Sequence, residues 1–170
     1  RLLEAEEHMQ QACAHWQQMG DMHSLIYGLL NLGVLYVEQG IVQQAMHYLT
    51  AAYQRAATTG ERTLTGNILN NMAIAYRLQH DFAQALLHAQ QAEQIFREHH
   101  NTLELAHVWH NLGLIYGQNN QTANANAYVA QALQIYRQLG NQYGEQKLLS
   151  DLARAALPVR GKRLLQLVAE

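Results

Sequence analysis

The most constraining feature of this sequence is a motif that recurs every 40 residues without insertion or deletion. Residues 31–36 (Asn-Leu-Gly-Val-Leu-Tyr) return as residues 71–76 (Asn-Met-Ala-Ile-Ala-Tyr) and as residues 111–116 (Asn-Leu-Gly-Leu-Ile-Tyr). A fixed period of this length predicts a fold built from stacked copies of one supersecondary unit. Several alanines keep the same step, in the two series Ala5, Ala45, Ala85, Ala125 and Ala12, Ala52, Ala92, Ala132.

Within each copy, the apolar residues are spaced as on one face of an α-helix. After Gly40 they follow at intervals of three and four residues, and a second helical stripe precedes Gly40. No segment shows the strict alternation of a half-buried strand, so the sequence predicts an all-α fold. Glycines between the stripes, such as Gly20 and Gly60, can take the left-handed conformation that ends a helix. Asp21 and Asp81 suit the starts of the helices that follow.

The repeat also predicts how the helices are grouped. One antiparallel helix pair cannot bury its apolar stripe alone, so we expect neighbouring pairs to stack into an α-solenoid. Gly33 and Gly113, with small residues such as Ala45, allow the two helices of a pair to approach closely, and tyrosines such as Tyr36 fill the space between pairs. The predicted array covers residues 1–157, with a half unit at 1–20, full units at 21–60, 61–100 and 101–140, a half unit at 141–157, and a tail or short capping helix at 158–170.

The composition excludes several classes of function. The chain has 11 Lys and Arg against 13 Asp and Glu, a formal net charge of -2, and so lacks the basic face that binds nucleic acid. It shows neither an apolar run long enough to span a membrane nor a signal-peptide pattern. Its single cysteine, Cys13, cannot form an internal disulfide, so we expect a reducing, cytoplasmic setting. Because the chain begins at Arg1 rather than at a methionine, we interpret it as a fragment of a longer protein, or as a processed or partly ordered chain, and its composition favours a bacterial protein.

The spacing of Leu32, Gly33 and Tyr36, followed by Ala45 and Ala52, resembles that of the tetratricopeptide repeat. The unit is 40 residues rather than the usual length of about 34, and the usual proline at the end of the second helix is missing. In this respect the chain is similar to the long-helix subclass found in MalT-like bacterial regulators, kinesin light chain and the LGN/Pins scaffolds. The resemblance implies a right-handed superhelix whose concave face, lined by the first helix of each pair, binds extended or helical peptide segments.

When the peptide-binding positions of the family are aligned with this sequence, they correspond to one group of residues on each first helix. Asn31, Asn71 and Asn111 align with asparagines that, in related repeats, hydrogen-bond the backbone of a bound peptide, and an amide can donate and accept at once. Only Arg77 and Lys147 are basic there, so the resemblance does not predict the carboxylate clamp of the chaperone-binding members. The implied peptide-binding residues are Tyr27, Asn31, Val34, Asn67, Asn70, Asn71, Ile74, Arg77, His107, His110, Asn111, Leu114 and Gln118.

Some of these residues also have structural interpretations. The asparagines could cap or bond a neighbouring helix instead, and the sequence leaves ligand contact and structural use open. His107 and His110 lie three residues apart on one helix face, but no metal-binding motif accompanies them, so we expect no metal and no other cofactor. The sequence also contains neither a nucleophile elbow nor a phosphate-binding glycine loop, so we do not expect an enzyme.

The sequence therefore predicts a scaffold module that binds other proteins. The expected partner is a protein or peptide segment, or a neighbouring domain of the same protein, without direct contact to nucleic acid or membrane. The alternative is the sensor or oligomerisation segment of a multidomain transcriptional regulator, for which a homodimer is possible. The two hypotheses differ in whether the purified chain associates with itself.

Overall fold

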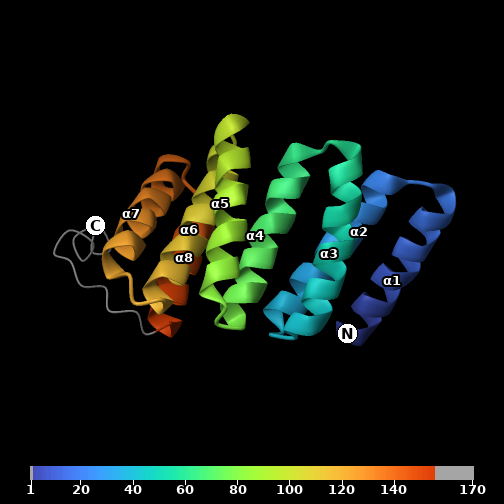
Figure 1. Cartoon of the computed structure of the whole chain (residues 1–170), viewed down its shortest axis with the longest axis horizontal. Coiled ribbons are helices and arrows are strands. Elements are labelled where there is room, and N and C mark those ends of the chain that lie inside the picture. The colour runs from blue at the N-terminus through green and yellow to red at the C-terminus, as the bar shows by residue number, and fades with distance from the viewer. Residues whose placement is uncertain (1, 156–170) are drawn as a thin grey trace. The chain divides into compact units, whose positions relative to one another are not determined.

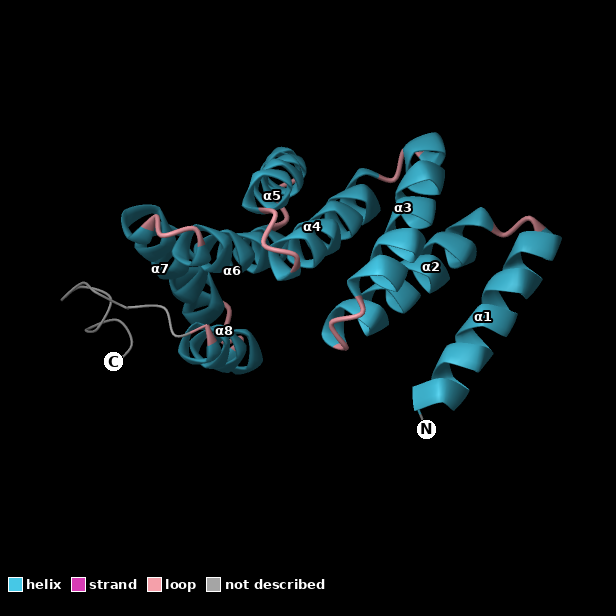
Figure 2. Cartoon of the chain, turned by 60° about the horizontal axis from the view of Figure 1, so that its bottom comes forward, coloured by secondary structure: helices cyan, strands magenta, loops and turns pink. Residues whose placement is uncertain are grey.

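The computed structural model describes residues 2–155, and every regular element in that range is an α-helix (Figure 1). Figure 2 shows the helices joined by short loops, as the repeat predicts, and the all-α, tetratricopeptide-type fold is confirmed. None of these helices is long and apolar enough to cross a bilayer. The helices are α1 (Leu2–Met19), α2 (Met22–Glu38), α3 (Val42–Thr59), α4 (Arg62–Leu78), α5 (Phe82–Glu98), α6 (Thr102–Gln118), α7 (Thr122–Gln138) and α8 (Gln142–Arg154).

The chain divides into two compact parts, which we call the N-terminal half (Arg1–Asp81) and the C-terminal half (Phe82–Glu170). This division falls inside the predicted unit 61–100, and the assignment of helices to units of 40 residues stays a prediction. The predicted end of the last helix at residue 157 and the predicted tail 158–170 lie outside the described residues.

Each half is a layer of helices in which neighbours along the chain pack together. In the N-terminal half, α2 contacts α1, α3 and α4, and its core includes Ile26, Leu32, Leu49 and Ile68. In the C-terminal half, α6 contacts α5, α7 and α8 in the same way. The first helix of a pair is therefore packed against both its own second helix and the next first helix, which places its remaining face where a ligand could reach it.

Backbone hydrogen bonds close the turn after α2 and the equivalent turns after α4 and α6. After α2, the Ile41 amide donates to the Tyr36 carbonyl over 2.9 Å, and the Gly40 amide donates to the Val37 carbonyl over 3.0 Å, as in a Schellman motif. This motif requires a left-handed residue at its centre, and Gly40 has φ +72°. The same conformation is imposed on non-glycine residues at the equivalent turns, which are His80 (φ +60°), His100 (φ +54°) and Asn120 (φ +59°).

Small residues allow the paired helices to approach closely, as the sequence predicts. A Cβ atom placed on Gly33 of α2 would lie 2.6 Å from the Leu49 side chain of α3. A Cβ atom on Gly113 of α6 would lie 2.6 Å from the Val129 side chain of α7. Such distances are well below ordinary contact, so a larger side chain at either glycine would force the two helices apart.

The repeated tyrosines contact the second helix of their own pair, and Tyr36 also reaches the preceding helix α1. Tyr36 stacks on Tyr48 of α3, with ring centroids 5.5 Å apart and planes 5° apart, and Tyr116 stacks on Tyr128 of α7 at 5.5 Å and 8°. Each of these rings therefore stacks on a ring of the second helix of its own pair. The Tyr36 hydroxyl additionally donates to Glu6 of α1, and this hydrogen bond raises the Tyr36 pKa to about 12.

Candidate functional site

In the N-terminal half, the predicted site residues form an accessible surface on α2 and α4. On α2, Tyr27 is 43% exposed and Asn31 is exposed, and both share one helix face with the half-buried Val34. On α4, Asn67, Asn70, Asn71, Ile74 and Arg77 are all half-buried. We call this surface, made of Tyr27, Asn31, Val34, Asn67, Asn71 and Ile74, the α2–α4 surface.

The amides of the α2–α4 surface have few partners within the protein. The Asn71 side chain donates to the Asn67 carbonyl, one turn earlier in the same helix, over 2.9 Å. Within residues 2–155, the Asn31 side chain forms no hydrogen bond. These asparagines can therefore donate to and accept from a guest backbone, because neither is engaged with a neighbouring helix.

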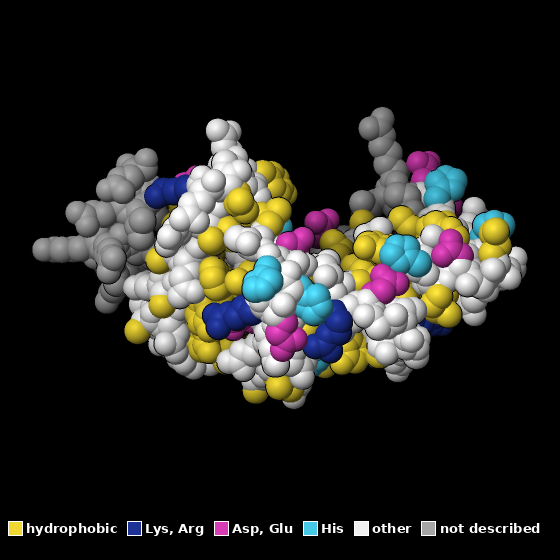
Figure 3. All heavy atoms as spheres, turned by 90° about the horizontal axis from the view of Figure 1, so that it is seen from above, with side chains coloured by type: hydrophobic (Ala, Val, Ile, Leu, Met, Phe, Trp, Pro, Cys, Tyr) yellow, Lys and Arg dark blue, Asp and Glu magenta, His cyan; other side chains and the backbone are white. Residues whose placement is uncertain are grey.

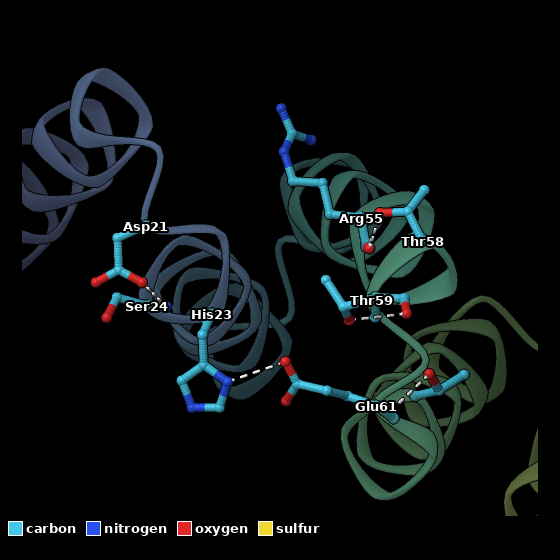
Figure 4. A network of polar contacts seen from close by, with 9 residues as sticks. Asp21, His23, Ser24, Arg55, Thr58, Thr59 and Glu61 are labelled. Atoms are coloured by element: carbon cyan, nitrogen blue, oxygen red, sulfur yellow. Dashed lines mark hydrogen bonds and ion pairs between the residues drawn. The ribbon is translucent and has the colours of Figure 1, made fainter.

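An ion pair marks one edge of this surface, where α2 and α4 begin (Figure 4). His23 Nδ1 lies 3.0 Å from Glu61 Oε1, and the His23 ring lies against Tyr27 with centroids 4.9 Å apart. Asp21 occupies the same repeat position as Glu61, but its carboxylate accepts from the Ser24 amide over 3.1 Å and so caps its own helix. Hydrogen bonding from Ser24, first through its side chain and then through its backbone amide, lowers the pKa of Asp21. Glu61 instead reaches sideways from the start of α4 to α2.

In the C-terminal half, three of the five matching residues are buried. On α6, His110 is 7% exposed, Asn111 is 9% exposed and Leu114 is 2% exposed. Gln118 is half-buried, and His107 keeps an exposed part. The Asn series thus has an exposed, a half-buried and a buried member, and the repeat position alone does not determine accessibility.

A polar pair that sequence reasoning missed lies between α6 and α8. His110 Nε2 lies 3.3 Å from Asp151 Oδ2, close enough for an ion pair but without the geometry of a hydrogen bond. Lys147 Nζ also donates to both oxygens of Asp151 over 2.8 Å. Burial alone would raise the pKa of Asp151, but His110 and Lys147 outweigh it and lower the pKa to about 2. Asp151 stands 40 residues after Asn111. This shared repeat position was the feature of the sequence that could have indicated that Asp151 lies beside α6.

Tyr136 of α7 is enclosed between the first helices on either side of it. A Cβ atom on Gly144 of α8 would lie 2.7 Å from the Tyr136 ring, and the His107 ring of α6 lies 5.6 Å from it between centroids. Tyr136 is 0% exposed, and its hydroxyl has no hydrogen-bond partner within residues 2–155. Burial, together with the charge of Asp151, raises the pKa of Tyr136. Burial and then the nearby His110 lower the pKa of His107.

A second polar cluster joins α5 to α6. Glu93 is buried, and its Oε1 accepts from the Trp109 indole over 2.7 Å and from Arg97 over 2.8 Å. The Arg97 guanidinium lies 5.9 Å from the centre of the Trp109 ring. Because the charge of Glu93 is compensated on both sides, this cluster stabilises the packing of two helices.

The two histidines considered as metal ligands face different neighbours, since His107 lies against Tyr136 and His110 against Asp151. In the part of the chain that the structure describes, no group of three histidine, cysteine or acidic side chains is placed to hold a metal ion. Cys13 is buried, and burial raises the pKa of its thiol, so the thiolate that reacts or binds metal is disfavoured. Figure 3 shows basic, acidic and histidine side chains mixed with apolar ones on the face it presents.

Comparison with known proteins agrees with this fold. The model of the tetratricopeptide repeat matches residues 24–98 and again residues 64–138. The chain is similar in structure to BtubC (BKLC) from P. vanneervenii, with a TM-score of 0.78 and 20% sequence identity, over 99% of this chain and 73% of that chain. A comparison with curated proteins gave no match. Tetratricopeptide repeats are generally protein-interaction modules and typically not catalytic. Since the two family matches together span residues 24–138, the chain belongs to the tetratricopeptide repeat family.

Proposed function

We propose that this chain is a non-catalytic module that binds an extended segment of a partner protein on the α2–α4 surface. The observation that carries the proposal is the exposure of Tyr27 and Asn31 on α2 beside the half-buried Asn67 and Asn71 on α4. An aromatic ring can cover an apolar side chain of the guest, and the amides can pair with its backbone. Each amide bond contributes about 0.5–1.5 kcal/mol net, so the site favours a modest affinity with a defined register.

The equivalent residues of the C-terminal half are mostly buried, and this limits the proposed site to the N-terminal half. His110, Asn111 and Leu114 leave little surface to a guest, since α8 approaches α6 through the pair of His110 and Asp151. His107 and Gln118 keep accessible parts and can extend the contact. The proposed binding energy therefore comes mainly from the N-terminal half.

The test uses short random peptides selected on the purified chain, with affinity measured by fluorescence anisotropy. We expect the double change Asn31→Ala and Asn71→Ala to weaken the selected peptides by roughly 5- to 100-fold, corresponding to two lost hydrogen bonds. Tyr27→Ala should weaken them as well. Gln54→Ala, at an exposed position of α3, is the matched control and should have no effect.

Helicity and thermal unfolding of the variants separate binding from folding. Retained helicity and folding, with at most the loss of about 0.5–1 kcal/mol expected from the Asn71 bond to Asn67, together with lost affinity support the proposal. Selected peptides whose affinity survives the changes at Asn31, Asn71 and Tyr27 would bind elsewhere and would contradict it. The alternative, a segment of a multidomain transcriptional regulator, stays a prediction, as do the bacterial origin and the cytoplasmic setting.

A further inference from the structure

The start of α4 carries a carboxylate that does not cap its own helix. Glu61 stands at the N-cap of α4, but its side chain forms no capping hydrogen bond. Asp21 and Asn141, at the same repeat position before α2 and α8, each accept from an amide of their own helix. Such a cap stabilises a helix start, and Asp or Asn in place of Glu61 could provide it. The Glu61 side chain is therefore better explained by what it faces than by the start of α4.

Glu61 faces α2, where it meets two aromatic rings. Its Oε1 lies 3.0 Å from His23 Nδ1 (Figure 4). The His23 ring in turn lies beside the ring of Tyr27, one turn further along α2, with centroids 4.9 Å apart and planes tilted by 56°. Because His23 contacts both the carboxylate and the Tyr27 ring, the three side chains form one continuous strip. We call Tyr27, His23 and Glu61 the acidic edge of the α2–α4 surface.

The side chains of the acidic edge are accessible to solvent. Those of His23 and Glu61 are 62% and 31% exposed, and Tyr27 is 43% exposed. The exposure of Tyr27 is typical of its repeat position, since His107 is exposed at the same position of α6, a helix that another first helix follows. An ion pair as accessible as that of His23 and Glu61 contributes little to stability, so the packing of α2 on α4 does not account for it.

The carboxylate of the acidic edge has no permanently charged partner. Within residues 2–155, Glu61 forms an ion pair with His23 and with no arginine or lysine, and His23 is a cation only when it is protonated. Arg55 of α3 points away from Glu61 and donates to the Ala51 carbonyl over 3.0 Å (Figure 4). Glu61 Oε2 accepts no hydrogen bond within the described residues, so it can accept one from a guest.

The wider charge distribution also favours a basic guest. The N-terminal half contains seven acidic residues and four basic ones, whereas the whole chain has 13 and 11. Helix α2 has no lysine or arginine, and its acidic residue, Glu38, is exposed. A surface of negative charge speeds the approach of a basic segment, and close pairs such as one with Glu61 then determine where the segment docks.

We propose that the guest segment of the α2–α4 surface carries an arginine, whose guanidinium stacks on the Tyr27 ring and donates to Glu61 Oε2. The proposal rests on the proposed function and names the guest residue that the acidic edge recognises. Arginine suits the site better than lysine, because a planar guanidinium can lie flat on an aromatic ring and present several donors to a carboxylate at once. An acidic guest residue would place like charges side by side, so the same edge selects against it.

A library of random nonapeptides selected on the full chain tests the proposal. We expect arginine to be enriched at one position of the selected peptides, and aspartate and glutamate to be depleted there. Selection on Glu61→Gln should still yield binding peptides, but without the arginine preference, since the amide keeps an acceptor for His23 and removes the charge. Glu38→Gln removes the same charge from an exposed position of α2 outside the acidic edge, and as the matched control it should keep the preference.

Substituting citrulline for the selected arginine measures the contact itself. Citrulline has nearly the shape of arginine but carries no charge. By fluorescence anisotropy, the substitution should weaken binding roughly 5- to 20-fold on the wild type and on Glu38→Gln, as expected for an exposed ion pair together with a cation–π contact. On Glu61→Gln the loss should shrink to roughly 2- to 4-fold, which is the share of Tyr27 alone. Tyr27→Leu, which keeps apolar bulk without the ring, should also reduce the loss.

The outcomes separate this proposal from the proposed function. Selected peptides that depend on Asn71 but show no arginine preference would overturn the proposal and leave the proposed function intact. A citrulline effect of equal size on the wild type and on Glu61→Gln would place the guest cation elsewhere and would overturn it as well. A chain that selects no peptide would overturn both. Circular dichroism checks that Glu61→Gln folds, as expected for a side chain that makes no capping bond.

Discussion

The two halves carry matched residues at matched repeat positions, but they use them differently. In the N-terminal half, the position before Asn31 holds Leu30, and Asn31 itself is exposed. In the C-terminal half, the position before Asn111 holds His110, which pairs with Asp151 of the next first helix. The comparison shows that the repeat fixes where a side chain lies, whereas its partner on the neighbouring first helix decides whether it is available to a ligand.

The largest expected effect comes from breaking the polar pair of the C-terminal half. Asp151→Ala leaves His110 buried beside no carboxylate, and we expect a loss of about 2 kcal/mol in the free energy of unfolding. Asn71→Ala, at the same repeat position of the N-terminal half, removes only a bond within its own helix and should cost about 0.5–1 kcal/mol. Urea unfolding followed by circular dichroism measures both.

A double change sharpens this comparison. His110→Leu with Asp151→Asn gives the C-terminal half the residues that the N-terminal half carries as Leu30 and Asn71. Because both members of the pair are replaced together, no buried charge is left without a partner. Lys147 loses its carboxylate but is solvent-exposed, so most of the stability lost in Asp151→Ala should be retained. Equal losses in the double variant and in Asp151→Ala would show that the pair is not the relevant difference between the halves.

A smaller effect is expected from acid. The folded pKa of Asp151 is about 2, below the unfolded value near 4, so its contribution is complete above pH 4 and is lost as the pH falls from about 4 to about 2. We expect roughly 1–2 kcal/mol of stability to be lost in this window. Asn71, at the same repeat position of the N-terminal half, has no titratable side chain and contributes nothing to this loss. The free energy of unfolding of the wild type and of Asp151→Asn, measured between pH 5 and pH 2.5, should converge as the pH falls; parallel curves would contradict this account.

The smallest expected effect concerns the turns. The position occupied by Gly60 in the N-terminal half is occupied by His100 in the C-terminal half, where φ is +54°. His100→Gly relieves this conformation and should stabilise the chain by about 0.5–1 kcal/mol. Gly60→His should destabilise it by a similar amount, because Gly60 has φ +72°. No steric clash adds to this cost, since a Cβ atom on Gly60 meets nothing within 4 Å. Thermal unfolding of both variants measures these shifts, and changes of the same sign would refute the explanation.

The fold was accessible from the sequence because its determinants are periodic. The helix stripes, the turn at Gly40 and the close approach at Gly33 and Gly113 all depend on residues that return at one step. Stacking of Tyr36 on Tyr48 was not predicted. The two tyrosines lie on different helices, and only Tyr36 belongs to the repeated motif.

The candidate site was less accessible for a related reason. Burial of His110 depends on Asp151, which stands one repeat later and departs from the Asn series. The bond from Trp109 to Glu93 likewise joins two residues that are each exceptions at their own repeat positions. Both pairs are formed by residues that differ from those at the equivalent positions of the other repeats. A search for residues that recur every 40 positions therefore does not find them.

The turn geometry has a consequence for how such a chain can vary. The hydrogen bonds that end α2, from Ile41 to Tyr36 and from Gly40 to Val37, join main-chain atoms only. Equivalent bonds persist where histidine or asparagine replaces glycine, at a cost in backbone conformation. Side-chain mutations can thus accumulate at these turns, because the main-chain bonds that end each helix do not depend on the side chain at the centre of the turn.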